Sequence, residues 1–192
     1  LMISSLSSTN FNFPLACTGQ NQSYKKELYQ SIGFSKISHL LQGDDSIFMQ
    51  LCNRNKSINV KFNTDKKSFV TSKYHSTWKD LLLQRIRWAA DANIMWRYNI
   101  IFYFIILATF ITNLFYLIIP IIFFNSIKYI IYFFTLKFIL ELSLYYIGIK
   151  KLEQKFKIAD FIKWFFIQIP YVVLVGILSF FISSFKWRGR AS

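Results

Sequence analysis

The sequence has few of the residues that build small disulfide-bonded or zinc-binding domains. It contains two cysteines in 192 residues, Cys17 and Cys52, and they have no paired spacing. This pattern excludes a disulfide scaffold and a zinc site, and it is typical of a reducing compartment. The two histidines, His39 and His75, are far apart and lack the spacing of metal ligands. We interpret them as ordinary loop or surface residues.

Two motifs of nucleotide-dependent enzymes are also missing. The chain has no Asp-x-Asp pair and no glycine-rich phosphate loop. It shows no internal repeat and no low-complexity linker. The sequence therefore has neither of these two motifs for binding a metal ion or a phosphate group.

Charge is absent from two long stretches. No charged residue lies between Arg97 and Lys128, and none lies between Lys163 and Lys186. A helix needs roughly 20 apolar residues to cross a bilayer, and both stretches are long enough. With 54% hydrophobic residues and 22 phenylalanines, the chain is also unusually apolar for its size. These features predict an integral membrane protein.

A third candidate span, residues 129–149, is interrupted by two charges. Lys137 and Glu141 are four residues apart, so that on a helix they lie on one face and pair, which lowers the cost of charge in the bilayer. A proton- or ion-path role is the alternative. Together the three stretches predict transmembrane helices at about residues 98–124, 128–149 and 163–185.

The chain is strongly basic, with a net charge of +14 at pH 7. Positive charge in a membrane protein indicates loops held on the cytoplasmic side, facing anionic lipid. No nucleic-acid-binding module is recognisable, so we expect no nucleic-acid partner. The lysines at 150–157 belong inside by the same rule, and three crossings then place the basic residues after 185 outside. A re-entrant stretch around Pro120 would resolve this conflict, and the orientation of the tail stays open.

The first 97 residues contain local signals for helices and strands. Helical patterns cover residues 24–31, ending at Gly33 as a C-cap, and residues 44–53, begun by Asp44 or Asp45 as an N-cap. An amphipathic helix is predicted from Thr77 to about Asn93, with Ser76 as its N-cap. Alternating residues predict strands at 58–62 and 69–71.

The amphipathic helix carries a functional pattern. Gln84, Arg87 and Trp88 stand at i, i+3 and i+4 and project from one face. An indole stacks on the flat face of a sugar, while an arginine fork binds two phosphate oxygens. The alternative is a helix lying on the membrane, with Trp88 and Trp96 as interfacial anchors and Arg85 and Arg87 facing headgroups.

Gly43-Asp44-Asp45 forms a second candidate site. Two carboxylates before a helix commonly act as an N-cap and as a first-turn charge that the helix dipole favours. A positioned carboxylate also serves as a general base, which removes a proton from an attacking hydroxyl. Both interpretations remain open on these residues alone.

The order of these features resembles the acceptor half of a membrane-bound, processive-type family 2 glycosyltransferase. An acidic pair at Asp44 and Asp45 is followed by Gln-x-x-Arg-Trp at 84–88 and then by membrane spans. Residues 17–26 are similar to the family's Gly-x-Asn-x-Ala-Tyr-Arg-Lys segment, and residues 185–190 are similar to its Trp-Lys-Gly-Arg tail. The family's usual Glu-Asp pair is Asp-Asp here, which leaves the role of Asp44 less defined.

The resemblance implies a fold and a division of the chain. It implies a GT-A-type α/β domain followed by an all-α membrane region of about three transmembrane helices. Residues 1–97 would be the acceptor-side, C-terminal part of the glycosyltransferase domain, and residues 98–192 the membrane region. About half of the parent protein, with the nucleotide-binding βα units, would lie upstream, so this chain alone is expected to be inactive.

The resemblance also implies an inverting, hexosyltransferase-type reaction. Asp45 matches the catalytic aspartate and Asp44 its neighbour, while the substrate-binding positions are Gly19, Asn21, Gln84, Arg87 and Trp88. The implied cofactor is a divalent cation, Mg or Mn, held by residues absent from this chain. The implied partners are a nucleotide-sugar donor, a lipid or polysaccharide acceptor and membrane lipids.

The implied location is a bacterial inner membrane, where the protein is multi-pass and its catalytic part faces the cytoplasm. A different class remains as the alternative: a non-catalytic membrane protein, such as a transporter or scaffold subunit, with a basic cytoplasmic domain.

Overall fold

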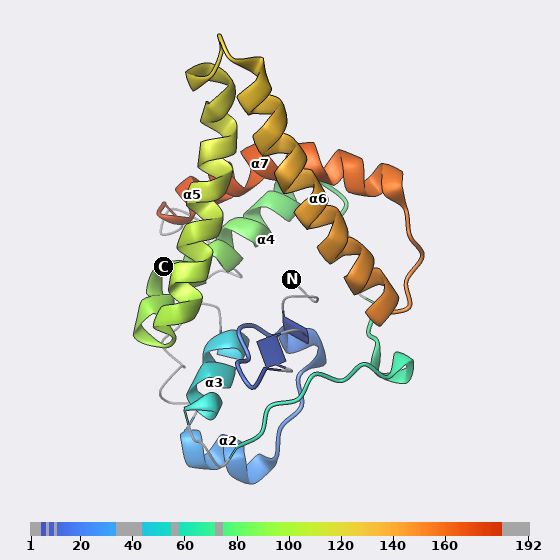
Figure 1. Ribbon diagram of the computed structural model, residues 1–192. Coiled ribbons are helices and arrows are strands. Elements are labelled where there is room, and N and C mark those ends of the chain that lie inside the picture. The colour runs from blue at the N-terminus through green and yellow to red at the C-terminus, as the bar shows by residue number, and fades with distance from the viewer. Residues whose placement is uncertain are drawn as a thin grey trace. The chain divides into compact units, whose positions relative to one another are not determined.

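The computed structural model describes residues 5–6, 8–9, 11–33, 44–54, 58–71 and 75–181. The chain divides into two compact units. The first holds the described residues up to Tyr103 together with residues 179–181, and the second is Phe104–Leu178. Figure 1 shows the helices of both units along the chain.

The first unit consists of short helices joined by extended loops. Its elements are η1 (Gly19–Asn21), α2 (Lys26–Ile32), α3 (Asp44–Asn53), η3 (Lys66–Ser68), α4 (Trp78–Ala90) and η4 (Asp91–Arg97). The helix predicted at residues 24–31 is α2, and it ends at Gly33, whose φ of 79° is left-handed. Glycine adopts this conformation without a steric penalty, so the predicted C-cap is confirmed.

The two predicted strands, at residues 58–62 and 69–71, are wrong in this structure. Within the described ranges no residue lies in a strand, so the α/β part of the expected fold is not seen. Residues 58–62 do keep the alternation that prompted the prediction: Ile58, Val60 and Phe62 are half-buried, while Asn59 and Lys61 are exposed. A strand also requires a neighbouring strand to bond with, and the pattern alone does not supply one.

The apolar core of the first unit gathers on α3. Ile47 is fully buried, and Phe48, Met49 and Cys52 are nearly so. Figure 1 draws α2 and α3 side by side. Between them, the ring of Phe48 lies 4.9 Å from that of Tyr24 and 5.8 Å from that of Tyr29, measured between centroids. These contacts set the orientation of α3, the helix that begins with the acidic pair.

Helix α4 begins and ends differently from the sequence prediction. Its N-cap is Thr77 rather than Ser76: the Thr77 hydroxyl accepts the N–H of Asp80 at 3.1 Å and donates to the Asp80 carboxylate at 2.7 Å. This reciprocal arrangement satisfies an N–H that the first turn would otherwise leave unpaired. The α-helix ends at Ala90, and the chain continues to Arg97 as the 3-10 helix η4.

The second unit contains most of three long apolar helices, where the sequence predicts membrane spans. They are α5 (Ile100–Ile122), which starts in the first unit, α6 (Ile127–Lys151) and α7 (Ile158–Ser179). Among the described residues these three are long and apolar enough to cross a membrane. Helix α7 starts earlier than predicted and includes Asp160 and Lys163 in its first turns. Helix α5 continues through Pro120, so this position contains no re-entrant turn.

Aromatic rings join α5 to α6, which form a hairpin in Figure 1. The rings of Phe115 and Phe133 meet edge to face at 5.5 Å, and those of Tyr116 and Phe134 at 5.4 Å. The Tyr116 hydroxyl donates to the carbonyl of Phe133 at 3.1 Å. Edge-to-face geometry is favoured because the positive ring edge meets the negative ring face.

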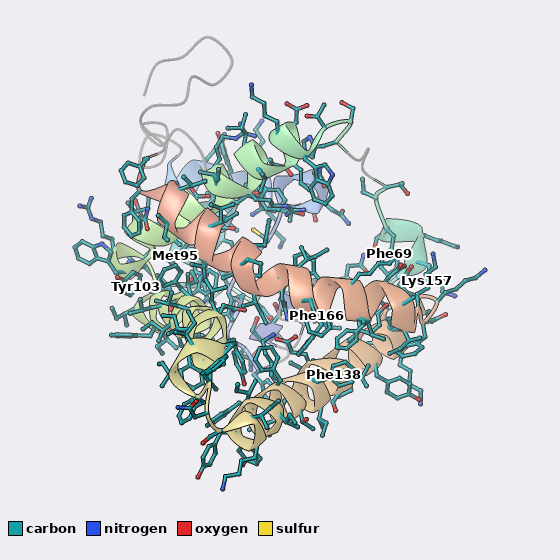
Figure 2. The ribbon with its side chains drawn as sticks, turned by 90° about the horizontal axis from the view of Figure 1, so that it is seen from above. Phe69, Met95, Tyr103, Phe138, Lys157 and Phe166 are labelled. Atoms are coloured by element: carbon teal, nitrogen blue, oxygen red, sulfur yellow. The ribbon has the colours of Figure 1, made fainter. Side chains whose placement is uncertain are left out.

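Helix α7 packs on the hairpin through a stripe with a spacing of four residues. Phe161, Phe165, Ile169 and Val173 are each at most 6% exposed. Figure 2 labels Phe138 of α6 and Phe166 of α7, and the ring of Phe138 lies 5.2 Å from that of Phe165. The other faces of these helices expose many large apolar side chains, as expected for helices that face lipid.

The predicted pairing of Lys137 with Glu141 is confirmed. Lys137 Nζ lies 2.5 Å from Glu141 Oε1, and Gln168 of α7 donates to Glu141 Oε2. Lys137 is 5% exposed, and its ammonium lies 4.6 Å from the ring centre of Phe165 and 5.5 Å from that of Tyr116. The charge is therefore held among all three helices by one carboxylate and two ring faces.

Candidate active site

The side chain of Asp45 lies at the first turn of α3, where backbone N–H groups have no helical partner. Its Oδ1 accepts the N–H of Ser46 at 2.7 Å. Its Oδ2 accepts the N–H of Gly19, from η1, at 2.6 Å. The two N–H groups fix the orientation of the carboxylate. Asp45 is half-buried, so part of its surface stays open.

Gly19 lies next to Asp45, and a side chain added here would touch its carboxylate. A Cβ at Gly19 would stand 3.5 Å from Asp45 Oδ2, which is an ordinary van der Waals contact. Glycine at this position leaves that side of the carboxylate uncovered. The structure thus brings together two of the predicted site residues, which are 26 positions apart in sequence.

A second set of bonds ties the same two segments together. The Cys17 thiol donates to the carbonyl of Asp45 at 3.2 Å, and the Ser46 hydroxyl donates to the carbonyl of Cys17 at 3.1 Å. Gln22 Nε2 also donates to the carbonyl of Asp45, at 3.5 Å. The position of Asp45 therefore depends on the loop that carries Gly19 as well as on its own helix.

The thiol of Cys17 is chemically quiet despite its place beside Asp45. Burial, and then the negative charge of Asp45, raise the pKa of the Cys17 thiol to about 12. At neutral pH the group remains a protonated thiol, and the thiolate is the reactive form. Cys17 thus serves as a hydrogen-bond donor here.

Asn21 is held by a neighbouring loop. Its Nδ2 donates to the carbonyl of Ser68, at the end of η3, at 2.7 Å. This bond joins η1 to the segment around residues 65–68, where Asp65 caps η3 by accepting the N–H of Lys67. Asn21 therefore steadies the loop that presents the Gly19 N–H to Asp45.

The three predicted residues of the Gln-x-x-Arg-Trp motif lie on α4. Gln84 and Arg87 are half-buried, and Trp88 is 42% exposed. The guanidinium of Arg85 stands 4.2 Å from the ring centre of Trp88, a pairing that the sequence analysis did not foresee. One face of the indole is thus covered by a cation. The bonds from Asp45 to η1 involve no residue of α4.

Several predicted positions lie outside the residues that can be described. These are Gly43, His39 and the basic tail at residues 185–190. Asp44 is the first residue of α3. His75 is half-buried in the loop before α4.

A divalent cation needs several ligating side chains close together. Among the described residues, no group of three or more His, Cys, Asp or Glu side chains is placed to hold a metal ion. Asp45 itself is engaged with backbone N–H groups and has no second carboxylate in these bonds. The described residues do not fit a divalent-cation site.

The sequence analysis missed three residues that tie α3 to the start of α5. They are Gln50 and Asn99, which share a hydrogen bond, and Arg54, which donates to the carbonyls of Arg97 and Tyr98. The position of Asn99 could have been predicted to be an N-cap, because asparagine is common directly before a helix and a long apolar stretch follows here. No local pattern marked its partner Gln50.

Comparison with known proteins gives one match. A family model described as "Glycosyl transferase family group 2" matches residues 1–149. No curated protein and no solved structure matches the chain. The matched range includes Asp45, the Gln-x-x-Arg-Trp motif and the first two membrane-spanning helices.

Proposed function

The chain belongs to glycosyl transferase family group 2, and from this premise we propose that Asp45 is the general base of an inverting sugar transfer at a membrane. The family match and the three helices able to cross a membrane make the protein a membrane glycosyltransferase at the general level. The observation that carries the more specific proposal is the Asp45 carboxylate, oriented by the N–H groups of Gly19 and Ser46.

The proposed reaction moves one proton and exchanges one bond. The acceptor hydroxyl oxygen attacks the anomeric carbon of the donor sugar, and its proton passes to a carboxylate oxygen of Asp45. The bond between the anomeric carbon and the diphosphate oxygen breaks, and the nucleoside diphosphate leaves from the opposite face. The configuration at the anomeric carbon is inverted, and no covalent intermediate with the protein is formed.

The geometry of Asp45 suits this role. Each carboxylate oxygen has two lone-pair directions, and each accepts one backbone N–H here. One direction on each oxygen therefore remains to receive an acceptor proton. Because the two N–H groups come from different segments, the carboxylate is held in one orientation before the substrate arrives.

We assign acceptor binding to the exposed face of α4. Trp88 offers a flat apolar surface for a sugar ring, and Gln84 and Arg87 lie on the adjacent turn. The Arg85 guanidinium over the Trp88 ring leaves the opposite ring face for stacking. We further propose that Gly19 and Asn21 shape the acceptor side next to Asp45, by the bonds described above.

The remaining parts of the proposal follow from the family. The donor is a nucleotide sugar of the hexosyl type, and the acceptor is a lipid or a growing polysaccharide. A divalent cation would be held by residues other than those described, within a GT-A-type domain to which residues 1–97 contribute the acceptor side. We place the catalytic part on the cytoplasmic face of a bacterial inner membrane, where nucleotide sugars are made.

The test is sugar transfer by the complete protein in membranes. Labelled UDP- and GDP-sugars are supplied one at a time, and labelled lipid and polysaccharide products are collected. We expect incorporation from one donor class, with the product linkage inverted relative to the donor when examined by NMR. If no donor supports transfer, the protein is better explained as a non-catalytic membrane protein. If the anomeric carbon keeps its configuration, Asp45 is not a simple general base.

A further inference from the structure

Gln50 is a buried amide on the helix that carries Asp45. It is 2% exposed, yet each polar atom of its side chain has a partner. Its Nε2 donates to the carbonyl oxygens of Pro14 at 3.0 Å and Leu15 at 2.7 Å. Its Oε1 accepts a hydrogen bond from Asn99 Nδ2 at 2.9 Å. A buried polar group bonded on every side fixes α3 against two segments that are distant in sequence.

Asn99 connects this amide to the first membrane-spanning helix. Its Oδ1 accepts the N–H of Phe102 at 3.0 Å, three residues along, as an N-cap does. The same side chain donates from Nδ2 to Gln50. One asparagine therefore caps the first turn of α5 with its oxygen and contacts α3 with its nitrogen.

Arg54 makes a second connection just after the end of α3. Its Nη2 donates to the carbonyl oxygens of Arg97 at 2.6 Å and Tyr98 at 3.1 Å. Its guanidinium stands 5.9 Å from the ring centre of Tyr98. A charged donor makes stronger hydrogen bonds than a neutral one, so this contact also holds α3 against the residues just before α5.

Because α3 is a helix, these contacts act on Asp45 at its other end. A helix rises about 1.5 Å per residue, so Asp45 and Gln50 are roughly 7.5 Å apart along one rigid element. A general base must stand within hydrogen-bond reach of the acceptor hydroxyl. A displacement of about 1 Å, caused by a change far from the chemistry, can lower a rate by about 10².

We propose that Gln50, Arg54 and Asn99 are positioning residues, which hold the Asp45 carboxylate in a fixed register against the start of α5. This inference rests on the proposed role of Asp45 as general base. These contacts fix the distance between the Asp45 carboxylate and the first turn of α5. Such a constraint suits an acceptor whose reacting hydroxyl is held at a fixed depth by the membrane.

Asn99→Asp separates the two bonds of Asn99. The carboxylate keeps the oxygen that caps Phe102, and aspartate is a good N-cap. It loses the Nδ2 donor and places an oxygen against Gln50 Oε1. Asn63→Asp is the matched control, because Asn63 lies on an exposed segment where its Oδ1 accepts the N–H of Asp65 at 2.9 Å. That variant adds the same charge and keeps the same bond.

Both variants are made in the complete protein and again in an Asp45→Asn background. We expect Asn99→Asp to lower kcat by about 10- to 100-fold with an unchanged KM for the donor, and Asn63→Asp to change kcat by less than about 2-fold. In the Asp45→Asn background, Asn99→Asp should lower the residual kcat no further, because the base it positions is already gone.

A second measurement does not depend on activity. The Cys17 thiol donates to the backbone of Asp45, so a displaced α3 should expose it. Labelling of Cys17 by a maleimide, followed by peptide mass spectrometry, should be several-fold faster in Asn99→Asp than in Asn63→Asp or the unmodified protein.

Two results would overturn the inference. One is an equal loss of kcat from Asn99→Asp in both backgrounds, which is the mark of a general structural defect. The other is normal kcat together with unchanged Cys17 labelling. If Asp45→Asn alone keeps full turnover, the proposed base is wrong. The labelling rate then decides by itself whether Asn99 and Gln50 hold α3 in place.

Discussion

The two units of the protein hold their parts together by different forces. In the first unit, segments far apart in sequence meet through side chains bonded to backbone groups, such as Gly19 with Asp45 and Gln50 with Pro14. In the second unit, the helices meet through aromatic rings and through the hydrogen bond from Gln168 of α7 to Glu141 of α6. The difference arises because the backbone N–H and C=O groups find their hydrogen-bond partners in different places in the two units.

In a membrane-spanning helix the backbone hydrogen bonds are satisfied within the helix, so side chains are left for packing. The first unit has long extended stretches, and its described residues form no strand in which such bonds are made. Polar side chains therefore take the place of a sheet as partners for the loop backbone. The carboxylate of Asp45 is set within this polar network, where its orientation can be fixed without burying it.

The largest expected effect tests whether the polar network of the first unit serves catalysis. Asp45→Asn keeps the size of the side chain and one accepting oxygen, but a neutral amide cannot take up the acceptor's proton. We expect turnover to fall by about 10² to 10⁴, equivalent to about 3 to 5 kcal/mol of activation free energy. Glu27→Gln, which removes an exposed carboxylate from α2 in the same unit, should leave turnover unchanged. Comparable losses in both would mean that charge in general matters, and not this carboxylate.

The next effect concerns the ion pair between Lys137 and Glu141 in the second unit. Glu141→Gln leaves the Lys137 ammonium, 5% exposed, without a carboxylate and should destabilise the protein by about 3 kcal/mol. Lys137→Met should cost less, because Glu141 still accepts a hydrogen bond from Gln168 of α7. The double variant should recover most of the loss. Thermal unfolding in detergent measures all three, and equal losses in the single variants would contradict this asymmetry.

A smaller effect tests the packing of rings in the second unit. A Cβ added at Gly176 of α7 would stand 2.6 Å from a ring carbon of Phe110 on α5, well inside contact distance. Gly176→Ala should therefore cost about 1 to 3 kcal/mol of stability through overpacking. Adding Phe110→Leu should restore part of it, and Phe110→Leu alone provides the control. If Gly176→Ala unfolds at the temperature of the unmodified protein, the two helices are not in close contact there.

The smallest effect lies on α4. Trp88→Ala in the complete protein should weaken use of the acceptor by about 1 kcal/mol, roughly 5-fold in KM, and leave donor binding unchanged. Trp78→Ala is the matched control, since Trp78 begins the same helix and is 72% exposed. If both variants instead reduce only membrane retention, Trp88 is an interfacial anchor.

Features that depend on neighbours in sequence were predicted well. The apolar stretches predicted the three long apolar helices, and the acidic pair predicted the start of α3 near Asp44. Spacing of four residues gave the Lys137–Glu141 pair, and glycine gave the end of α2 at Gly33. In each case the pattern and the physical cause lie within one turn or one element.

Features that depend on distant partners were missed or wrong. The segment at residues 58–62, predicted as a strand, keeps its alternation, but no strand lies beside it among the described residues. Nothing near Gln50 in sequence indicates that its amide contacts both Pro14 and Asn99. The bond from Gly19 to Asp45 was likewise not predicted, although both residues were named for their resemblance to the family. Tertiary contacts of this kind have no local period to detect.

The most direct test of the central claim compares the two neighbouring carboxylates. Turnover of Asp45→Asn and of Asp44→Asn in the complete protein is measured at saturating donor, with expression and donor affinity checked for both. We predict a loss of about 10² to 10⁴ for Asp45→Asn and a clearly smaller loss for Asp44→Asn. Near-normal turnover in Asp45→Asn with an inactive Asp44→Asn would move the base by one residue. Near-normal turnover in both would leave the pair as a helix cap and contradict the account.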